Sequence, residues 1–543
     1  MKKLYVSFAA LLVGSTLNAQ TAFWNETTYK GAFPVTDNTA ATDWTSGWAN
    51  FDPENTVYGA PTSTVSTDIT ANTTWSGIVL LQNKVYVKNN AVVTIMPGTI
   101  IRGDKTTGGT LVITKGSKLM AEGTVAQPIV FTSSEAVGSR AEGDWGGLVL
   151  LGQARNNQPG GIANIEGIAP SGLTEHGGAD DNDNSGSLKY VRIEFPGIPL
   201  APNKEINGLT MGSVGNATKI DYIQVSFSGD DSFEWFGGTV DCKHLIAYRG
   251  LDDDFDTDFG FSGRIQFGLI IRDKDMSDAA GDSNAFESDN DATGTNALPR
   301  TSAVFSNITI IGAKGDGSIT LPAGEKFEKA FRIRRNSSIS VFNTLVTGWE
   351  KGLSIEDGAA TENNFTGDSA VFANNILSNF TTGVKIVSAA NSFYATFFGA
   401  NNNDTTTTIA QIQWVNIFAA LGTTPDARLS ASSTAATGAD FSDEKFTGGF
   451  AGLEEVAAIS ALNLYPNPSS TTATLSLSVK ESANVQVRVI DMTGKVVAEA
   501  FNGNLSAGTN NVQINTSVLP AGIYNTVVVS ENSVQNIRLV VSK

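Results

Sequence analysis

The sequence repeats short apolar runs at a nearly constant interval, and this repeat limits the folds that the chain can adopt. The run YIQV at Tyr222 is followed by HLIA at His244 and FGLI at Phe267. The same signal continues with longer insertions in ITII at Ile308 and TLVT at Thr344. Strands this short need stacked neighbours, and an interval of about 22 residues is typical of a parallel β-helix with three short strands in each turn.

The rest of the pattern agrees with an all-β chain. From Ser76 onward, apolar runs alternate with Gly, and no window of eleven or more residues shows helical spacing, so we expect few helices. Hairpin signals such as Asn-Gly between paired runs are scarce, which disfavours a β-sandwich for the body. We predict a right-handed parallel β-helix over residues 76–450. An N-terminal cap region over 20–75 precedes it, in which Trp44 and Trp48 cover the open end of the solenoid.

The N-terminus has the features of an export signal. Lys2-Lys3 precede an apolar run from Leu4 to Val13, and a small-residue cleavage site ends at Ala19, so we predict a signal peptide over 1–19. No later run reaches the ~18 apolar residues of a spanning helix, and we expect no transmembrane segment. The one cysteine, Cys242, excludes an internal disulfide, and we expect it to be buried as a small apolar residue.

The sequence pattern of the C-terminal segment predicts a separate small β-domain. Its motifs are YPNP at Tyr465, VRVIDMTGKVV (Val487–Val497), LPAGIYNTVVV (Leu519–Val529) and a basic-apolar tail that ends at Lys543. This ordered set resembles the C-terminal sorting domain of type IX secretion in the Bacteroidetes. One departure from the family is Asn525-Thr526, where an aromatic residue is usual after Ile-Tyr. The resemblance implies a β-sandwich over 462–543. We predict that the boundary segment before it, residues 451–461, is a linker. The resemblance also implies export by the type IX secretion machinery to the outer cell surface or the medium.

The body also resembles a known group. The segments that carry the resemblance are TIMPGTIIRGDK (Thr94–Lys105), KLMAEGTVAQPIVFTS (Lys118–Ser133), GDWGGLVLLGQA (Gly143–Ala154) and the block from Tyr190 to Gly312. They are similar to Bacteroidetes surface proteins with a pectate-lyase-like β-helix. That group has no common established activity, so the resemblance implies the fold and leaves the chemistry open.

Acidic residues recur at the repeat interval in two segments, GDDSFEWFGG from Gly229 and GLDDDFDTDFG from Gly250. An offset of one repeat interval aligns three pairs of carboxylates: Asp230 with Asp252, Asp231 with Asp253, and Glu234 with Asp256. We expect Asp275 and Asp278 one turn further, at the same interval. Because equal positions of a β-helix lie about 4.8 Å apart, these carboxylates should stack and repel one another.

A bound cation would offset this repulsion. Ca²⁺ takes six to eight oxygen ligands and tolerates irregular sets. We predict that it is held by Asp230, Asp231, Asp252, Asp253, Asp254 and Asp256. Arg249 and Arg272, which are one repeat interval apart, offer the alternative of ion pairs with the same carboxylates. We also predict that Glu234, Trp235, Arg249 and Arg272 contact a ligand beside the acidic residues, with the indole of Trp235 stacking on a sugar ring.

The chain lacks residues that several catalytic chemistries require. With only two histidines, His176 and His244, HExxH zinc chemistry is excluded and a His-based triad is not expected. Polygalacturonase-type hydrolases resemble the chain at Gly229-Asp230-Asp231 but carry a Gly-His-Gly motif that is missing here. A lyase would combine Ca²⁺ with an Arg or Lys base, for which Arg249, Arg272 and Lys274 are the candidates. We assign no catalytic residue.

The missing catalytic motifs and the predicted destination favour a binding protein on the cell surface. The net charge of −18 disfavours nucleic acid and anionic membranes as partners. We therefore expect a secreted or cell-surface protein that binds a polysaccharide or surface glycan, or mediates adhesion. Two alternatives stay open: a Ca²⁺-dependent polysaccharide lyase or glycoside hydrolase, and a structural surface-layer component.

Overall fold

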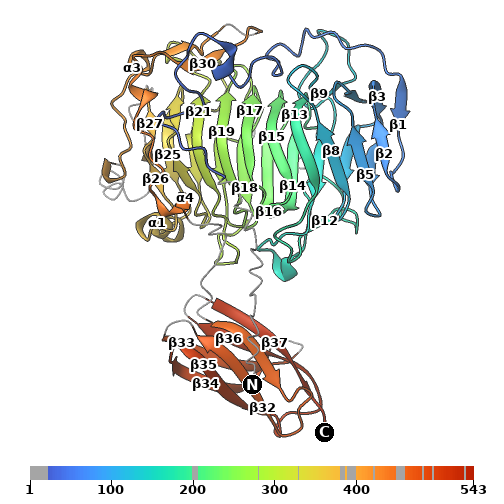
Figure 1. Cartoon of the computed structure of the whole chain (residues 1–543), viewed down its shortest axis with the longest axis vertical. Coiled ribbons are helices and arrows are strands. Elements are labelled where there is room, and N and C mark those ends of the chain that lie inside the picture. Colours follow the sequence, from blue (N-terminus) through green and yellow to red (C-terminus); the bar gives the residue numbers. More distant parts are fainter. Residues whose placement is uncertain are drawn as a thin grey trace, which may run out of the picture.

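A computed structural model describes residues 23–198, 206–278, 281–327, 329–378, 386–387, 399–419, 422–447, 459–479, 482–491, 495–530 and 533–543. The predicted signal peptide and most of the predicted linker lie outside these residues. The described body is a right-handed parallel β-helix, as the repeat predicts. Figure 1 shows its rungs side by side, from blue at the first rung to orange at the last.

The β-helix contains two long parallel sheets. The larger sheet has 16 strands: β1 (Ser63–Val65), β2 (Thr73–Trp75), β3 (Ile78–Leu81), β5 (Val92–Ile95), β6 (Ile100–Gly103), β8 (Lys118–Glu122), β9 (Ile129–Ser133), β13 (Gly186–Glu194), β15 (Lys219–Ser226), β17 (Cys242–Tyr248), β19 (Arg264–Ile271), β21 (Val304–Ile311), β23 (Ser340–Phe342), β24 (Leu345–Thr347), β26 (Phe372–Ala373) and β27 (Ile376–Leu377). The second sheet has 10 strands: β4 (Lys84–Val87), β7 (Thr110–Ile113), β10 (Gly147–Leu151), β14 (Leu209–Val214), β16 (Phe233–Gly238), β18 (Phe255–Asp258), β20 (Phe286–Ser288), β22 (Lys329–Ile333), β25 (Lys351–Ile355) and β28 (Ile386–Val387).

Helices are short and few among the described residues, as the absence of helical spacing predicts. They are α1 (Ala359–Thr366), α3 (Ile409–Ile412), α4 (Glu444–Thr447) and the 3₁₀ turns η1 (Ala40–Thr42), η2 (Pro159–Gly161) and η3 (Thr434–Ala436). Two small antiparallel pairs lie in loops: β11 (Ala163–Asn164) with β12 (Glu175–His176), and β29 (Trp414–Asn416) with β30 (Asp426–Leu429). No described helix has the length and apolar character needed to cross a membrane.

The long strands of the larger sheet bend at one residue in each rung. Tyr190, Tyr222, His244 and Phe267 have left-handed backbones with φ between 50° and 65°, which turns each strand from one face of the β-helix to the next. Their rings stack in a column, with centroids 4.5, 4.1 and 5.1 Å apart. On either side of this column, residues of β15 pair in parallel with β17, and residues of β17 with β19, at the predicted repeat interval.

The N-terminal segment, residues 23–58, lies along the side of the β-helix. Gly31 donates a backbone hydrogen bond to Asn343, whereas Asn50 donates to the side chain of Gln224, several rungs away. Between these points the indole of Trp44 stacks on Phe33 and its edge meets the aromatic column. The prediction that the tryptophans cover the open end is therefore wrong, because the segment covers a lateral face. The first rung already begins at β1 and β2.

Apolar side chains fill the interior of the β-helix along its whole described length. Phe233, Phe255, Phe286 and Phe331 stand at equal positions of successive rungs, with ring centroids about 5 Å apart. Cys242 lies in the same core and is fully buried, as the sequence predicts. This stacked core holds the strands that carry the acidic residues in a fixed register.

The C-terminal unit is an antiparallel β-sandwich with a core of its own. Its strands are β31 (Ile459–Tyr465), β32 (Thr472–Val479), β33 (Ala483–Ile490), β34 (Val496–Leu505), β35 (Gly508–Asn515), β36 (Gly522–Ser530) and β37 (Ser533–Val541). They form sheets of three and four strands. Buried residues from both sheets make one hydrophobic cluster that contains no residue of the β-helix core. The alternation of buried and exposed residues along β32 and β33 is that expected for a two-layer sandwich.

Candidate functional site

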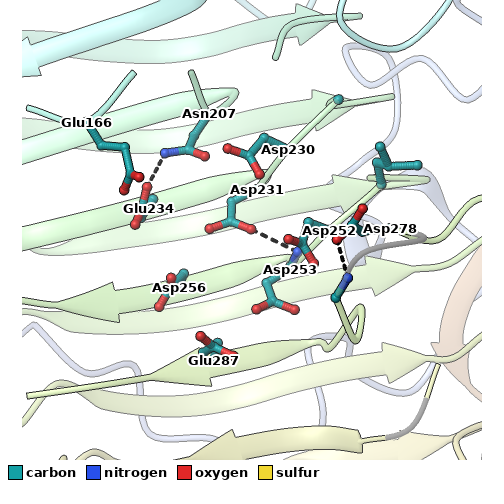
Figure 2. Close-up of a pocket in the computed structure, with 13 residues that line it drawn as sticks. Glu166, Asn207, Asp230, Asp231, Glu234, Asp252, Asp253, Asp256, Asp278 and Glu287 are labelled. Atoms are coloured by element: carbon teal, nitrogen blue, oxygen red, sulfur yellow. Dashed lines mark hydrogen bonds between the residues drawn. The ribbon is translucent and has the colours of Figure 1, made fainter. Parts of the chain in front are cut away.

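A pocket of about 570 Å³ lies on the flank of the ten-stranded sheet, beside β14, β16, β18 and β20. Nine of its thirteen lining residues are Asp or Glu (Figure 2). They are Glu166, Asp230, Asp231, Glu234, Asp252, Asp253, Asp256, Asp278 and Glu287. None of the described lining residues is Lys, Arg or His. The pocket is therefore a concentrated source of carboxylate oxygen.

The rung register brings these carboxylates together. Glu234 pairs with Asp256 between β16 and β18, and Asp256 pairs with Glu287 between β18 and β20. In the turn before these strands, the backbone N–H of Asp253 donates to Oδ1 of Asp231 at 2.9 Å. The structure thus confirms the predicted offset of one repeat interval and places the aligned side chains on one face.

The next rung differs from the prediction. Asp275 and Asp278 belong to an insertion between β19 and β20, and the strand position above Asp256 is occupied by Glu287. Asp278 nevertheless returns to the pocket, where its Oδ2 accepts the N–H of Gly281 at 2.5 Å. Asp275 lies outside the pocket and pairs with Lys274 at 2.5 Å. The fixed offset fails here because the insertion lengthens the turn.

Sequence reasoning also missed three polar lining residues. Glu287 could have been found, because Phe286-Glu287 repeats the Phe-acid pairs Phe233-Glu234 and Phe255-Asp256. Asn207 lies two residues before the pairing of Leu209 with Phe233, which places it beside Asp231. Glu166 comes from a loop between β11 and β12, for which the repeat gives no signal.

Five carboxylates of the pocket form no ion pair with a described residue: Asp231, Glu234, Asp252, Asp253 and Asp256. Burial is the main cause that raises the pKa of each of them. Neighbouring carboxylates raise these pKa values further, and the pKa of Asp252 reaches about 7, with Asp278 as its next largest cause. Without a counter-ion the fold therefore favours protonated carboxyl groups in this pocket.

The paired carboxylates Glu234, Asp256 and Glu287 form an acidic row across three rungs. Arginines neutralise this row only at its last member, Glu287. Arg332 lies 3.1 Å from Glu287, Arg334 pairs with both Glu287 and Asp289, and Arg335 lies 2.7 Å from Asp289. These arginines come from and directly after β22, the rung beyond β20. The rungs of β16 and β18 have no such partners among the described residues, so the uncompensated charge is confined to the pocket.

Two predicted site residues form a buried ion pair and do not line the pocket. Nε of Arg272 lies 2.7 Å from Oδ2 of Asp254, and both side chains are fully buried. Arg272 also donates to the backbone carbonyls of Gly250, Asp252 and Asn284. This corrects the assignment of Asp254 to the metal and of Arg272 to a ligand, because neither side chain is accessible. The alternative that Arg272 pairs with the acidic segment is the one observed.

Arg249 and Trp235 also lie away from the pocket. Arg249 pairs with Asp273 and with Glu54 of the N-terminal segment, at 3.0 Å for the latter. Trp235 is 0% exposed in the hydrophobic core, where its ring stacks on Phe261. The prediction that Trp235 offers a face to a sugar is therefore wrong. Of the four predicted ligand contacts, the structure places only Glu234 in the pocket.

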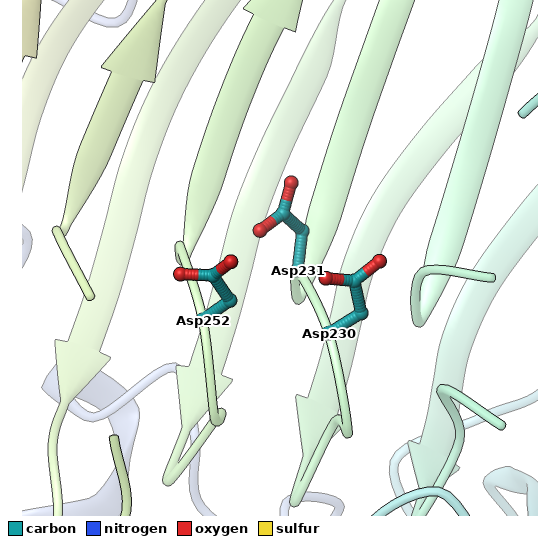
Figure 3. A group of neighbouring side chains, drawn as sticks. All are labelled: Asp230, Asp231 and Asp252. Carbon is teal, nitrogen blue, oxygen red and sulfur yellow. The ribbon is translucent and has the colours of Figure 1, made fainter. Parts of the chain in front are cut away.

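Two overlapping groups of carboxylates are close enough to share a metal ion. Asp230, Asp231 and Asp252 form the first group (Figure 3), and Asp231, Glu234 and Asp256 form the second. Within each group, one oxygen of every residue lies within 4.8 Å of the others. An all-oxygen donor set suits a hard cation such as Ca²⁺ rather than Zn²⁺, which favours nitrogen and sulfur. Asp253 is less available, since its Oδ1 accepts two hydrogen bonds from Asn284.

Comparison with known families gives two matches within the chain. A family model described as pectate-lyase-like β-helix domain matches residues 62–419, which is more than half of the chain. A second, described as secretion system C-terminal sorting domain, matches residues 463–542. Among curated proteins, none matches the chain.

A solved structure was also found by comparison of folds. It is full-length tailspike protein 2 from the Escherichia coli O157:H7 bacteriophage CAB120, with 11% sequence identity and a TM-score of 0.23. The alignment covers 86% of this chain and 64% of the tailspike. The chain thus spans less than two thirds of the tailspike's length.

Proposed function

The chain belongs to the pectate-lyase-like β-helix family, and from this membership and its acidic pocket we propose that it binds acidic glycans through divalent cations. The sorting domain directs the protein to the cell surface or the extracellular space, and it implies the type IX secretion machinery as a partner. The site of action is therefore outside the cell, where polysaccharides are abundant and Ca²⁺ is available to weak sites.

The observation that carries the proposal is the set of buried and half-buried carboxylates that form no ion pair with a described residue. A pocket of this charge, on a chain with a net charge of −18, repels a polyuronate or a sulfated glycan. A cation held by Asp231 and its neighbours offsets part of this charge and gives the glycan a positive centre to bind. Its remaining coordination positions can accept a carboxylate of the glycan, since Ca²⁺ takes more ligands than three side chains supply.

A glycoside hydrolase is the second candidate function. It is favoured by the carboxyl groups with raised pKa values, of which Asp252 at about 7 is suited to give a proton to a leaving group near neutral pH. A lyase has less support, because no described lining residue is an Arg or Lys that could take the proton next to a uronate carboxylate.

The test is glycan binding by the purified exported chain with Ca²⁺ or with a chelator. We expect polygalacturonate or alginate to bind only with Ca²⁺, and Asp231→Asn to abolish binding. Asp275→Asn is the matched control, since Asp275 is exposed and outside the pocket. Binding that survives both the chelator and Asp231→Asn would refute the proposal. An assay for new reducing ends in the same samples distinguishes the hydrolase.

A further inference from the structure

The two carboxylate groups of the pocket share one member, Asp231. Oxygens that surround one Ca²⁺ at about 2.3–2.6 Å lie no more than about 5 Å apart. The oxygens of each group lie within 4.8 Å of one another and so fit one coordination sphere. Apart from Asp231, the two groups have no residue in common. They therefore describe two adjacent coordination spheres rather than one.

The fold places Asp231 between these spheres. Asp230 and Asp252 precede strands β16 and β18, whereas Glu234 and Asp256 lie within the same strands. Asp231 has two carboxylate oxygens and is 7% exposed. The N–H of Asp253 donates to its Oδ1 at 2.9 Å, which restrains the orientation of the carboxylate. Carboxylates that lie between two sets of ligands in this way bridge the ions of two-metal sites, which are about 3.5–4 Å apart.

A buried amide gives a second, independent indication of a ligand. Asn207 is 2% exposed, its Nδ2 donates to Oε2 of Glu234, and its Oδ1 has no hydrogen-bond partner among the described residues. In Figure 2 the amide lies between Glu234 and Asp230, with the oxygen turned toward Asp230. A buried amide oxygen without a partner is costly, and coordination of a cation removes this cost. Amide oxygens are common Ca²⁺ ligands.

The two groups also contain more carboxylates than one divalent ion can neutralise. Together they contain five carboxylates, Asp230, Asp231, Glu234, Asp252 and Asp256. When these five are ionised, one divalent cation leaves three of their negative charges uncompensated, and two cations leave one. We propose, on the basis of the cation site proposed above, that the pocket binds two divalent cations bridged by Asp231. Asn207 is then a neutral ligand of the ion on the Asp230 side.

Calcium titration of the full exported chain, stripped with a chelator and followed by calorimetry, tests this proposal. We expect two ions for the native chain and one each for Asp252→Asn and Glu234→Gln, which remove a ligand from different groups. Asp231→Asn should weaken both ions by roughly tenfold or more. Asn207→Ala should weaken one ion and leave the other. Asp275→Asn should still bind two. Circular dichroism without Ca²⁺ identifies any variant that fails to fold.

The outcomes separate this inference from the proposed function. A single ion in the native chain, or two ions with native affinity in Asp231→Asn, would overturn the two-ion site. The loss of the same single ion in both Asp252→Asn and Glu234→Gln would also overturn it. Two ions without any Ca²⁺-dependent binding of polygalacturonate or alginate would support the two-ion site and refute glycan binding.

Discussion

At the scale of single residues, the pocket favours the neutral form of its carboxyl groups when no cation is bound. Burial raises the pKa of Asp252 to about 7, with a further contribution from Asp278, while Arg272 opposes the shift. In an unfolded chain an aspartate releases its proton near pH 4. Between these values the folded protein binds a proton that the unfolded chain does not. Its contribution to stability therefore falls as the pH rises.

The pH dependence of stability should reveal this proton. In a chelator, we expect Asp252→Asn to become more stable than the native chain as the pH rises from about 4.5 to 8, by on the order of 2 kcal/mol. The reason is that the amide carries no charge to bury. Urea unfolding at several pH values measures the difference. Added Ca²⁺ should stabilise the native chain at pH 8 and have little effect at pH 4.5. A difference between variant and native chain that does not change with pH would contradict this account.

At the scale of elements, the rung on which a carboxylate lies determines whether an arginine is close enough to pair with it. Arg334 follows β22 and contacts both Glu287 and Asp289, which are largely buried. We expect Arg334→Ala to destabilise the fold by ~2 kcal/mol, because it removes charge-assisted hydrogen bonds from two buried carboxylates, each of which keeps one other arginine. Denaturant unfolding measures the loss, and Lys274→Ala, at an exposed ion pair, is the control. Excess Ca²⁺ should recover part of the loss in Arg334→Ala. Equal stability of the two variants would refute the role of Arg334.

The pairing register of the strands could be predicted from the sequence, whereas the shift that an insertion causes in this register could not. The constant offset holds between β16 and β18 because no insertion interrupts the turns there. It fails at β20, where the insertion after β19 moves Glu287 to a position that a fixed interval does not reach. The recurring Phe-acid pair would have identified Glu287, because the aromatic residue of each rung enters the same core stack.

The direction of side chains was also open to prediction from the pattern. In β16, Phe233 and Trp235 belong to the core cluster and Glu234 lines the pocket. Because side chains of a strand alternate between its two faces, Glu234 and Trp235 cannot face the same ligand. The burial of Asp254 and Arg272 has no such signal. It depends on the path of the turn before β18, which the sequence does not specify.

The N-terminal segment is the element whose placement differs most from expectation. Trp48 is 1% exposed, and its ring meets the edges of Tyr190 and Tyr222. We expect Trp48→Ala to destabilise the protein by about 3–5 kcal/mol, since it opens a cavity between the segment and the rungs. Thermal unfolding and limited proteolysis of residues 23–58 measure the effect. Val57→Ala, at a residue that is 82% exposed, should change neither. An unaffected Trp48→Ala would mean that the segment contributes little to stability.

At the scale of the whole molecule, the protein combines two units with separate cores. The strands of the sorting domain pair only with one another among the described residues, and its hydrophobic cluster contains no residue of the β-helix. Every described residue of the acidic pocket belongs to the β-helix unit. Cation binding and export should therefore depend on different parts of the chain.

Removal of the sorting domain tests this division. In a chain that ends at Thr447, we expect the unfolding transition of the β-helix and its stabilisation by Ca²⁺ to match those of the full chain, because no core residue is lost. The same chain should not reach the cell surface, since the match over residues 463–542 carries the sorting signal. Calorimetry with and without Ca²⁺ measures the first expectation, and surface labelling of cells that express both forms measures the second. A truncated chain that loses the Ca²⁺ effect would show that the sorting domain supports the pocket. Surface delivery without the domain would place the export signal elsewhere in the chain.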